Sequence, residues 1–595
     1  MDNKNTGIKF FLVIIFILFG TYFIYLAGRI LSGLSIKKYV INFFQNLFIS
    51  DINLSQIKSI IDQYIDIRFL PDENFLACCL FILGISIFIL STGIFIKNIS
   101  ENENFSSSKF FDNRKLSSII ILFSLIFSLV YLFQNFNGPI SRFNSFKQTE
   151  VASNIYHYVN NGFGLKEYLL NDNEDLKFFS FPFYQWTAAL ICKLFNLQVE
   201  QGGRLLNILI FFFTYLLFFK LIKLFNIKPV LIALVLFIFS TSPLVIYYYR
   251  SVHPDPMAIF FSYLSLYYFI VYEKSGRTKH FLFSLIAAMI ACLIKNPIYL
   301  MIFVTILYYR LTSKSFNKLL SRDIIIYTIT IVFIVIFYKF LADYLNNGLS
   351  LKTSWIFGTF DQRISLLPYF LLFNWLAVEL INPLFFLMVL LFFIKNFLKY
   401  NVQDDYKKFN LGLFWGMFIT ILIFFNVFQA HDYYHLPFVF IFSSIIVCYF
   451  YELIKKFFNY NKFLVATSFV VFIMIQLSWF YFMKFPLFAD ENIMSGANFI
   501  KQNTEMDSYI FYTVGKDIQG WDPTYLFNSR RQGFNICLEN INKQGYLDSI
   551  INKYAYKFER IYLYIPKDLE SEFFYTSIEK PIVKQGKDGI LMLLK

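Results

Sequence analysis

Long apolar runs recur along almost the whole chain, and they constrain its fold more than any other feature of the sequence. Their length suits a membrane, because a helix of about 20 apolar residues crosses the hydrocarbon layer of a bilayer. The first run, at 8–31, has no small-residue cleavage site after it, so we interpret it as a retained span and not as a signal peptide. Only 15% of the residues are charged, whereas soluble domains have about 25%. The sequence therefore predicts a mainly α-helical protein that crosses a membrane many times.

Positive charges lie mainly in the short loops between the apolar runs. The formal net charge is +14, which in a soluble domain would suggest nucleic acid as a partner. Here the loop charges are typical of topology signals, because lysine and arginine mark the cytoplasmic ends of spans. We therefore expect no nucleic-acid partner. The six cysteines have no C-x-x-C spacing and indicate neither a disulfide framework nor a zinc ribbon.

The positive-inside rule predicts about 13 spans with a cytoplasmic N-terminus. The segment 181–197 is short and aromatic and contains Lys193, so we place it on the outer surface as a juxtamembrane helix. If it were a span, every later loop would change sides, and the lysine-rich loops would no longer share the cytoplasmic side. The predicted spans are 8–31, 74–97, 116–136, 203–224, 230–249, 256–272, 280–294, 298–310, 324–343, 376–395, 411–428, 438–454 and 463–483.

The tail of the chain, 486–595, is charged and mixed in composition. The strand-like runs SYIFYTV, RIYLYIP and GILMLLK alternate with the helix-like ANFIKQN and YLDSIINKYA. This alternation predicts a small soluble α/β domain outside the membrane. We therefore expect three parts: two extra N-terminal spans with an outer loop at 1–115, a transmembrane catalytic module at 116–485, and this domain at 486–595.

The predicted outer turns are rich in polar residues, beginning with the loop SRFNSFKQTEVASNIYHYVNNGFG. Gln148 and Glu150 stand at the start of a helix-compatible pattern in this loop. A partly desolvated carboxylate at the bilayer surface can act as a general base toward a hydroxyl. The alternative is that Glu150 only complements the positive end of its helix.

A second outer turn, RSVHPDP, joins two spans and carries Arg250, His253 and Asp255. Arginine suits phosphate binding, and the histidine and aspartate could share a metal or a hydroxyl. The alternative is an arginine that reaches the headgroups and an aspartate that starts the next helix beside prolines. Lys295, at the mouth of a span, is either a partner for a lipid phosphate or a lysine that extends to the headgroups.

A third outer turn, HDYYHLP, has His431 and His435 four residues apart, which would face the same way in a helix. With Asp432 they could ligate zinc. Hydrogen bonding around a sugar phosphate is the interpretation that we favour. Tyr433 and Tyr434 are typical of an interfacial aromatic belt.

From about Leu116 to the tail, the chain resembles GT-C glycosyltransferases of the dolichyl-phosphate-mannose–protein mannosyltransferase type, including bacterial aminoarabinose lipid A transferases. No single motif is specific, but the ordered series on the predicted outer face is. Its segments are FKQTEVASNIYHYVNNG, FPFYQWTAALICKLFNL with QGGRLLNILI, YYRSVHPDP, LIKNP, HDYYHLP and WDPTYLFNSRRQG.

The resemblance implies a GT-C-like fold and an inverting transfer of a sugar from a polyprenyl phosphate to an acceptor hydroxyl. The reaction would take place on the outer face of a bacterial cytoplasmic membrane. Glu150 would be the base, Asp255 would help build the site, and Lys295 would face the donor phosphate, whose leaving charge needs cations. The remaining candidates are Arg250, His431 and Tyr434 near the phosphate, and Gln148, Tyr184, His253 and His435 around the substrates.

Two positions depart from the family pattern. Many relatives carry an acidic residue before the proline that matches Pro182, where this chain has Phe181. The residue before the Gln-Thr step is Lys147 and not arginine. One expected metal ligand is therefore missing, so the sequence implies no certain cofactor and leaves a divalent metal open.

Two other classes of function stay open at this point. A transporter or lipid flippase predicts charges at mid-bilayer and paired broken helices in two halves, whereas the charges here gather in outer turns. A non-catalytic membrane assembly protein predicts that Glu150 and Asp255 are freely replaceable. The sequence identifies neither the donor sugar nor the acceptor, which would be a lipid, a glycan or a protein.

Overall fold

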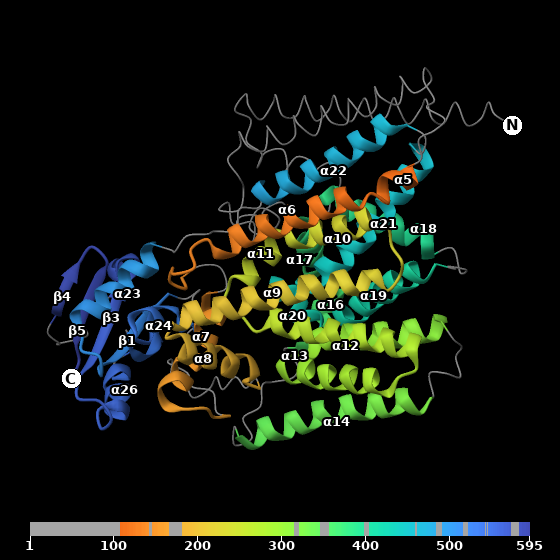
Figure 1. The fold of residues 1–595 in the computed structure, drawn as a ribbon. Coiled ribbons are helices and arrows are strands. Elements are labelled where there is room, and N and C mark those ends of the chain that lie inside the picture. The colour runs from red at the N-terminus through yellow and green to blue at the C-terminus, as the bar shows by residue number, and fades with distance from the viewer. Residues whose placement is uncertain are drawn as a thin grey trace.

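The structure is a computed structural model in which a helical body stands beside a small sheet domain (Figure 1). The two predicted N-terminal spans and their loop lie outside the residues that it describes. These residues are 107–141, 145–165, 181–313, 321–345, 356–397, 404–458, 461–482, 491–515, 522–541, 543, 545–572 and 582–595.

The helical body follows the predicted order of apolar segments. Its first half contains α5 (Ser107–Phe111), α6 (Arg114–Phe133), α7 (Ser145–Asn161), α8 (Phe183–Phe195), α9 (Val199–Lys223), α10 (Pro229–Ser240), α11 (Pro243–Tyr249), α12 (Asp255–Ser275), α13 (Thr278–Ser313) and α14 (Arg322–Leu345). Its second half contains α16 (Phe360–Ile364), α17 (Leu366–Asn374), the π-helix η4 (Trp375–Leu380), α18 (Pro383–Phe397), α19 (Asp405–Ile423), α20 (Phe425–Ala430), the 3-10 helix η5 (Asp432–His435), α21 (Phe438–Phe457) and α22 (Lys462–Phe482).

Several of these helices are long and apolar enough to cross a bilayer. Within the described part of the chain there are five, or seven if each of two bent pairs is one span. Large apolar side chains such as Ile119 on α6 and Phe333 on α14 are exposed, as a lipid surface requires. The chain is therefore a multi-pass membrane protein.

One predicted span, 376–395, is not a single helix. The segments Leu366–Leu380 and Pro383–Lys395 meet at an angle of 112°. Ile381 is extended, and Pro383 begins a new helix because proline cannot continue the hydrogen-bond ladder of the preceding one. The first residues of the predicted span thus belong to η4, which continues α17. A smaller bend of 63° separates α10 from α11 within the predicted span 230–249.

Helix α13 folds back on itself at Lys295, where the backbone is extended (φ −162°, ψ 96°). Lys295 pairs with Asp255 at the start of α12, and Arg310 pairs with Glu273 near the end of α12. The chain after the break therefore runs back along α12. The two arms of this hairpin correspond to the predicted spans 280–294 and 298–310.

The C-terminal residues form the predicted α/β domain. Its elements are α23 (Glu491–Asn503), β1 (Tyr509–Val514), α24 (Thr524–Ser529), β2 (Gln532–Cys537), α25 (Leu538–Ile541), α26 (Tyr546–Tyr554), β3 (Ile561–Pro566), the 3-10 helix η6 (Lys567–Glu572), β4 (Ile582–Gly586) and β5 (Gly589–Leu593). The five strands lie in the order β2-β1-β3-β5-β4. Strand β1 is parallel to β2 and β3, whereas β5 is antiparallel to β3 and β4.

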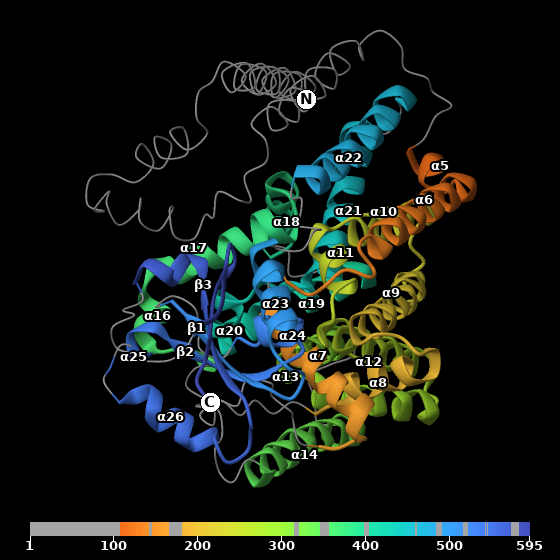
Figure 2. The same cartoon turned by 90° about the vertical axis from the view of Figure 1, so that its left-hand side faces the viewer.

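Helices cover both faces of this sheet (Figure 2). Alternate residues of β1 point to opposite faces, so Ile510 and Tyr512 join the core shared with the helical body, while Tyr509 and Phe511 pack near α26. The predicted strand-like runs correspond to β1, β3 and β5. Strands β2 and β4 were not predicted because their sequences, QGFNIC and IVKQG, have polar residues and no clear apolar alternation.

Candidate active site

Helix α7 places Gln148 and Glu150 among its buried residues. Lys147 Nζ lies 2.8 Å from Glu150 Oε1. Gln148 Nε2 donates to Tyr247 Oη at 3.1 Å, and Gln148 Oε1 accepts from the backbone N–H of Val252 at 3.4 Å. These bonds connect α7 to α11 and to the RSVHPDP turn, so two of the predicted segments meet.

The RSVHPDP turn is buried and forms hydrogen bonds with α9. Asn207 Nδ2 donates to the carbonyl oxygens of Ser251 at 2.6 Å and His253 at 2.9 Å. A Cβ atom at Gly203 would lie 2.7 Å from Val252 Cγ1, so a glycine at this position allows the turn to approach the helix. The segment QGGRLLNILI therefore acts on the site by supporting this turn.

Asp255, the first residue of α12, is fully buried and binds two other predicted site residues. Its Oδ1 lies 2.6 Å from Lys295 Nζ, and its Oδ2 lies 2.5 Å from His253 Nδ1. The Lys295 ammonium also lies 4.4 Å from the ring centroid of Tyr433 and 3.9 Å from that of Tyr434. A carboxylate and two aromatic faces thus surround this cation at the tip of the α13 hairpin, and both kinds of contact stabilise a positive charge.

His431 and Tyr434 share this charged environment. Burial, followed by the positive charges of Lys295 and Lys147, lowers the pKa of His431 to about 3. Burial also raises the pKa of Tyr434, and nearby carboxylates, that of Glu150 among them, raise it further. Electrostatic effects of this kind act over short distances in a buried site. The charged groups of α7 and of the α13 hairpin therefore face one common region.

Arg250 and Tyr184 lie next to this region. Arg250 ends α11, and its guanidinium carbon is 5.6 Å from the ring centroid of Tyr247. Tyr184 on α8 is fully buried, and its Oη donates to the carbonyl oxygen of Gly203 at 3.2 Å. Arg250 is thus close to the Gln148 contact, whereas Tyr184 contacts the backbone of the helix that supports the turn.

The two histidines of HDYYHLP do not share a helical face. Helix α20 ends at Ala430, His431 is extended (φ −138°, ψ 125°), and only the short η5 precedes Pro437. No α-helix therefore contains both histidines. His431 stacks on Tyr433, whereas His435 Nε2 lies 2.7 Å from the carbonyl oxygen of Phe428. Across the residues that the structure describes, no three His, Cys, Asp or Glu side chains are grouped to hold a metal ion.

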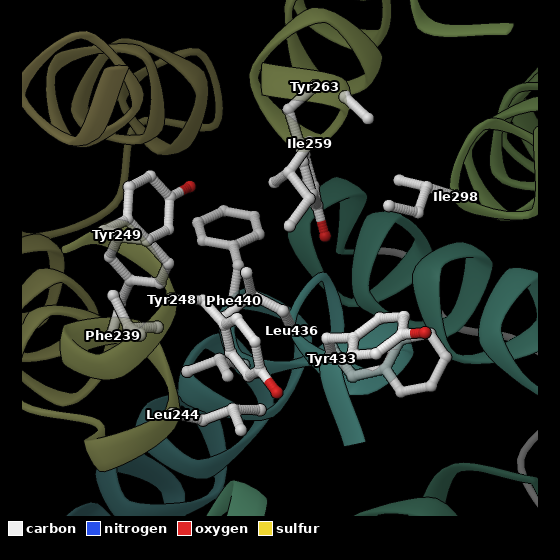
Figure 3. Packing of buried hydrophobic residues seen from close by; sticks show 14 of the residues in the cluster. Phe239, Leu244, Tyr248, Tyr249, Ile259, Tyr263, Ile298, Tyr433, Leu436 and Phe440 are labelled. Carbon is white, nitrogen blue, oxygen red and sulfur yellow. The ribbon is translucent and has the colours of Figure 1, made fainter. Parts of the chain in front are cut away.

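Two tyrosines of the site, Tyr248 and Tyr433, were not predicted as site residues. Tyr248 Oη donates to the two carboxylate oxygens of Asp432 at 2.7 and 2.8 Å, and the ring centroids of Tyr248 and His253 are 5.3 Å apart. Figure 3 shows Tyr248 and Tyr433 projecting from one apolar cluster with their hydroxyls in different directions. Their only signal in the sequence is an aromatic run, which is equally typical of an interfacial belt.

The helical body, the carboxylate-bearing helix α7 and the small sheet domain together have the architecture of a GT-C fold. The crystal structure of ArnT from Cupriavidus metallidurans in the apo state matches with a TM-score of 0.55 and 12% sequence identity, covering 80% of this chain and 97% of that chain. The structure of ArnT from Cupriavidus metallidurans bound to undecaprenyl phosphate matches with a TM-score of 0.54 and 11% identity, over the same 80% and 97%. At this identity the likeness shows the shared fold.

A family model described as dolichyl-phosphate-mannose-protein mannosyltransferase matches residues 181–341. The matched range runs from α8 to α14 and contains both Asp255 and Lys295. No curated protein sequence matches the chain. The predicted resemblance is confirmed: the chain has a GT-C-like fold, and its residues 181–341 match the mannosyltransferase family model.

Proposed function

We propose that this chain is a glycosyltransferase that moves a sugar from a polyprenyl phosphate to an acceptor hydroxyl of a lipid, glycan or protein. We place the reaction at the outer face of a bacterial cytoplasmic membrane. The observation that carries the proposal is the electrostatic interaction of a buried carboxylate, Glu150, with the cation Lys295 in one region between α7 and the α13 hairpin. The match to a mannosyltransferase family model and the undecaprenyl phosphate bound by ArnT support it.

Glu150 is the proposed general base. Its carboxylate takes the proton of the acceptor hydroxyl while the acceptor oxygen attacks the anomeric carbon of the donor sugar. The bond between that carbon and the phosphate oxygen breaks, and the phosphate leaves with the electron pair. A single displacement of this kind inverts the configuration at the anomeric carbon. Lys147, 2.8 Å from Glu150, orients the carboxylate.

Lys295 is the proposed partner of the leaving phosphate. A cation at this point stabilises the charge that develops as the bond to the sugar breaks. Asp255 and the rings of Tyr433 and Tyr434 hold the ammonium in place. His431 contributes one N–H donor and no positive charge at neutral pH, because its pKa is about 3. Arg250 lies near enough to Tyr247 and Gln148 to assist from α11.

The test is glycosyl transfer in membranes that contain the wild type or Glu150→Gln, with a panel of radiolabelled polyprenyl-phosphate sugars as donors. The matched control is Glu452→Gln. Glu452 lies in the C-terminal part of α21, where its carboxylate pairs with Lys395 of α18 and Lys407 of α19. Loss of a general base slows a reaction roughly 10²- to 10⁴-fold. We expect a loss of this size in Glu150→Gln at equal expression, and wild-type transfer in the control.

Transfer that survives in Glu150→Gln would contradict the role of this residue. A second outcome concerns the reaction class. If no donor supports transfer in membranes to which lipid, glycan and protein acceptors have been added, the chain is not a glycosyltransferase of this class, and the alternative function of a transporter is favoured.

A further inference from the structure

A short helix of the C-terminal domain, α24, lies against α7, the helix that carries Glu150 (Figures 1 and 2). The residues in contact are more than 300 positions apart in the sequence, as the contact of Thr149 with Thr524, 375 positions apart, illustrates. The C-terminal domain contributes none of the site residues described above. Its contact with α7 still reaches both sides of the proposed base.

Thr524, the first residue of α24, touches the start of α7. Its Oγ1 lies 3.1 Å from Ser145 Oγ and 3.4 Å from Thr149 Oγ1, and Thr149 is the neighbour of Glu150. Asp522 accepts hydrogen bonds from the N–H of Thr524 at 2.9 Å and from its hydroxyl at 2.5 Å, which fixes the threonine rotamer. Both threonines are buried, so no solvent competes for these contacts.

Two further contacts continue this interface on either side of the base. Asn528 Nδ2 donates at 2.6 Å to the carbonyl oxygen of Ile140, in the segment before α7. Arg530 Nη2 lies 2.5 Å from Glu200 Oε1 on α9, and its guanidinium stands 5.8 Å from the ring centroid of Tyr156 on α7. Arg530 thus joins three elements: α24, α9 and the second half of α7.

We propose that α24 positions α7 for catalysis, so that Thr524 and Arg530 are positioning residues that hold Glu150 in register with the donor. The inference rests on the proposed function of Glu150. A misplacement of about 1 Å lowers a catalysed rate roughly 10²-fold, so the position of the helix that carries the base matters for the rate. The C-terminal domain then acts on the chemistry without touching a substrate.

The experiment compares Arg530→Ala and Thr524→Val with the wild type in the full-length protein. Arg560→Ala is the matched control, because Arg560 pairs with Glu505 on the exposed face of the same domain. We expect kcat to fall at least 10-fold in Arg530→Ala, with the KM for the lipid donor within 2-fold of wild type. The exchanged pair Arg530→Glu/Glu200→Arg should recover at least a third of the wild-type kcat. Thr524→Val keeps the side-chain shape but removes the hydroxyl. It is therefore the second test of the contact between α24 and α7 if Arg530→Ala does not fold.

Hydrogen exchange of α7 gives a readout that does not depend on transfer. In lipid nanodiscs we expect amides of 145–161 to exchange at least 5-fold faster in Arg530→Ala and at the wild-type rate in Arg560→Ala. Unchanged exchange in α7, or faster exchange with unchanged kcat, would overturn the positioning role. If the wild type transfers no sugar, the proposed function fails, whereas the contact of α24 with α7 is still decided by the exchange rates.

Discussion

Substitution of one member of the ion pair of Asp255 and Lys295 is expected to have a large effect on the free energy of unfolding. Asp255 is fully buried, and removing one member of a buried pair costs about 3–5 kcal/mol because the other charge stays uncompensated. We expect Lys295→Met to lower the free energy of unfolding by about this amount. The double variant Asp255→Asn/Lys295→Met should regain most of the stability but no transfer activity. Thermal unfolding of the purified variants measures the first effect, and equal instability of the single and double variants would contradict it.

His431 gives a prediction about pH at the same scale. Its pKa is lowered to about 3, below an unfolded value of about 6.5. The folded state therefore favours the neutral ring, and the stability that this provides is present above about pH 6.5 and is lost as the pH falls toward 3. We expect His431→Gln to lower the rate of transfer without changing the shape of its pH profile between about pH 5 and 8. A rate step in this window that disappears in the variant would show that the ring is charged in the working enzyme.

Among the elements, α9 has the most specific requirement, which is for glycine under the RSVHPDP turn. A Cβ atom at Gly203 would lie 2.7 Å from Val252 Cγ1, so either the turn or the helix must move. Overpacking of this kind costs about 1–3 kcal/mol. We expect Gly203→Ala to lower the unfolding temperature and to reduce transfer through displacement of Asp255. Gly164→Ala is the control, since no atom lies within 4 Å of its new methyl group, and both variants are compared by thermal unfolding and by transfer assay.

The order of helices was predictable because apolar periodicity and loop charge are local properties of the sequence. Local breaks were only partly predictable. The break at Lys295 was predicted, because Lys295, Asn296 and Pro297 interrupt the apolar run between two predicted spans. The bend of 112° before Pro383 was not predicted, because the apolar run continues across it.

The candidate site shows the same limit. Asp255 and Lys295 were predicted as separate candidates from separate turns, and the structure brings them to within 2.6 Å. The pairing itself was not predictable, because it depends on the return of α13 along α12. For His431 and His435, the helical spacing suggested a common face, but His431 is extended and the residues after it form a 3-10 helix.

In the molecule as a whole, the helical body and the C-terminal domain meet at α24, and Asp522, just before this helix, is a partly buried carboxyl group. Burial raises the pKa of Asp522, although the hydrogen bonds from Thr524 oppose this effect. A raised pKa means that the folded state favours the protonated form. The stability that it provides is therefore fully present below the unfolded pKa, about 3.9, and is lost as the pH rises through the folded value.

We therefore expect the contact of α24 with α7 to loosen as the pH is raised from about 4 toward neutrality. Asp522→Asn should remove this dependence, because an amide oxygen can still accept from Thr524 but carries no charge. Hydrogen exchange of 522–541, corrected for the intrinsic effect of pH on exchange, measures the contact in the full-length protein. The control is Asp548→Asn on the exposed side of α26. If Asp522→Asn and Asp548→Asn keep the same pH dependence as the wild type, the carboxyl group of Asp522 does not couple the two parts of the molecule to pH.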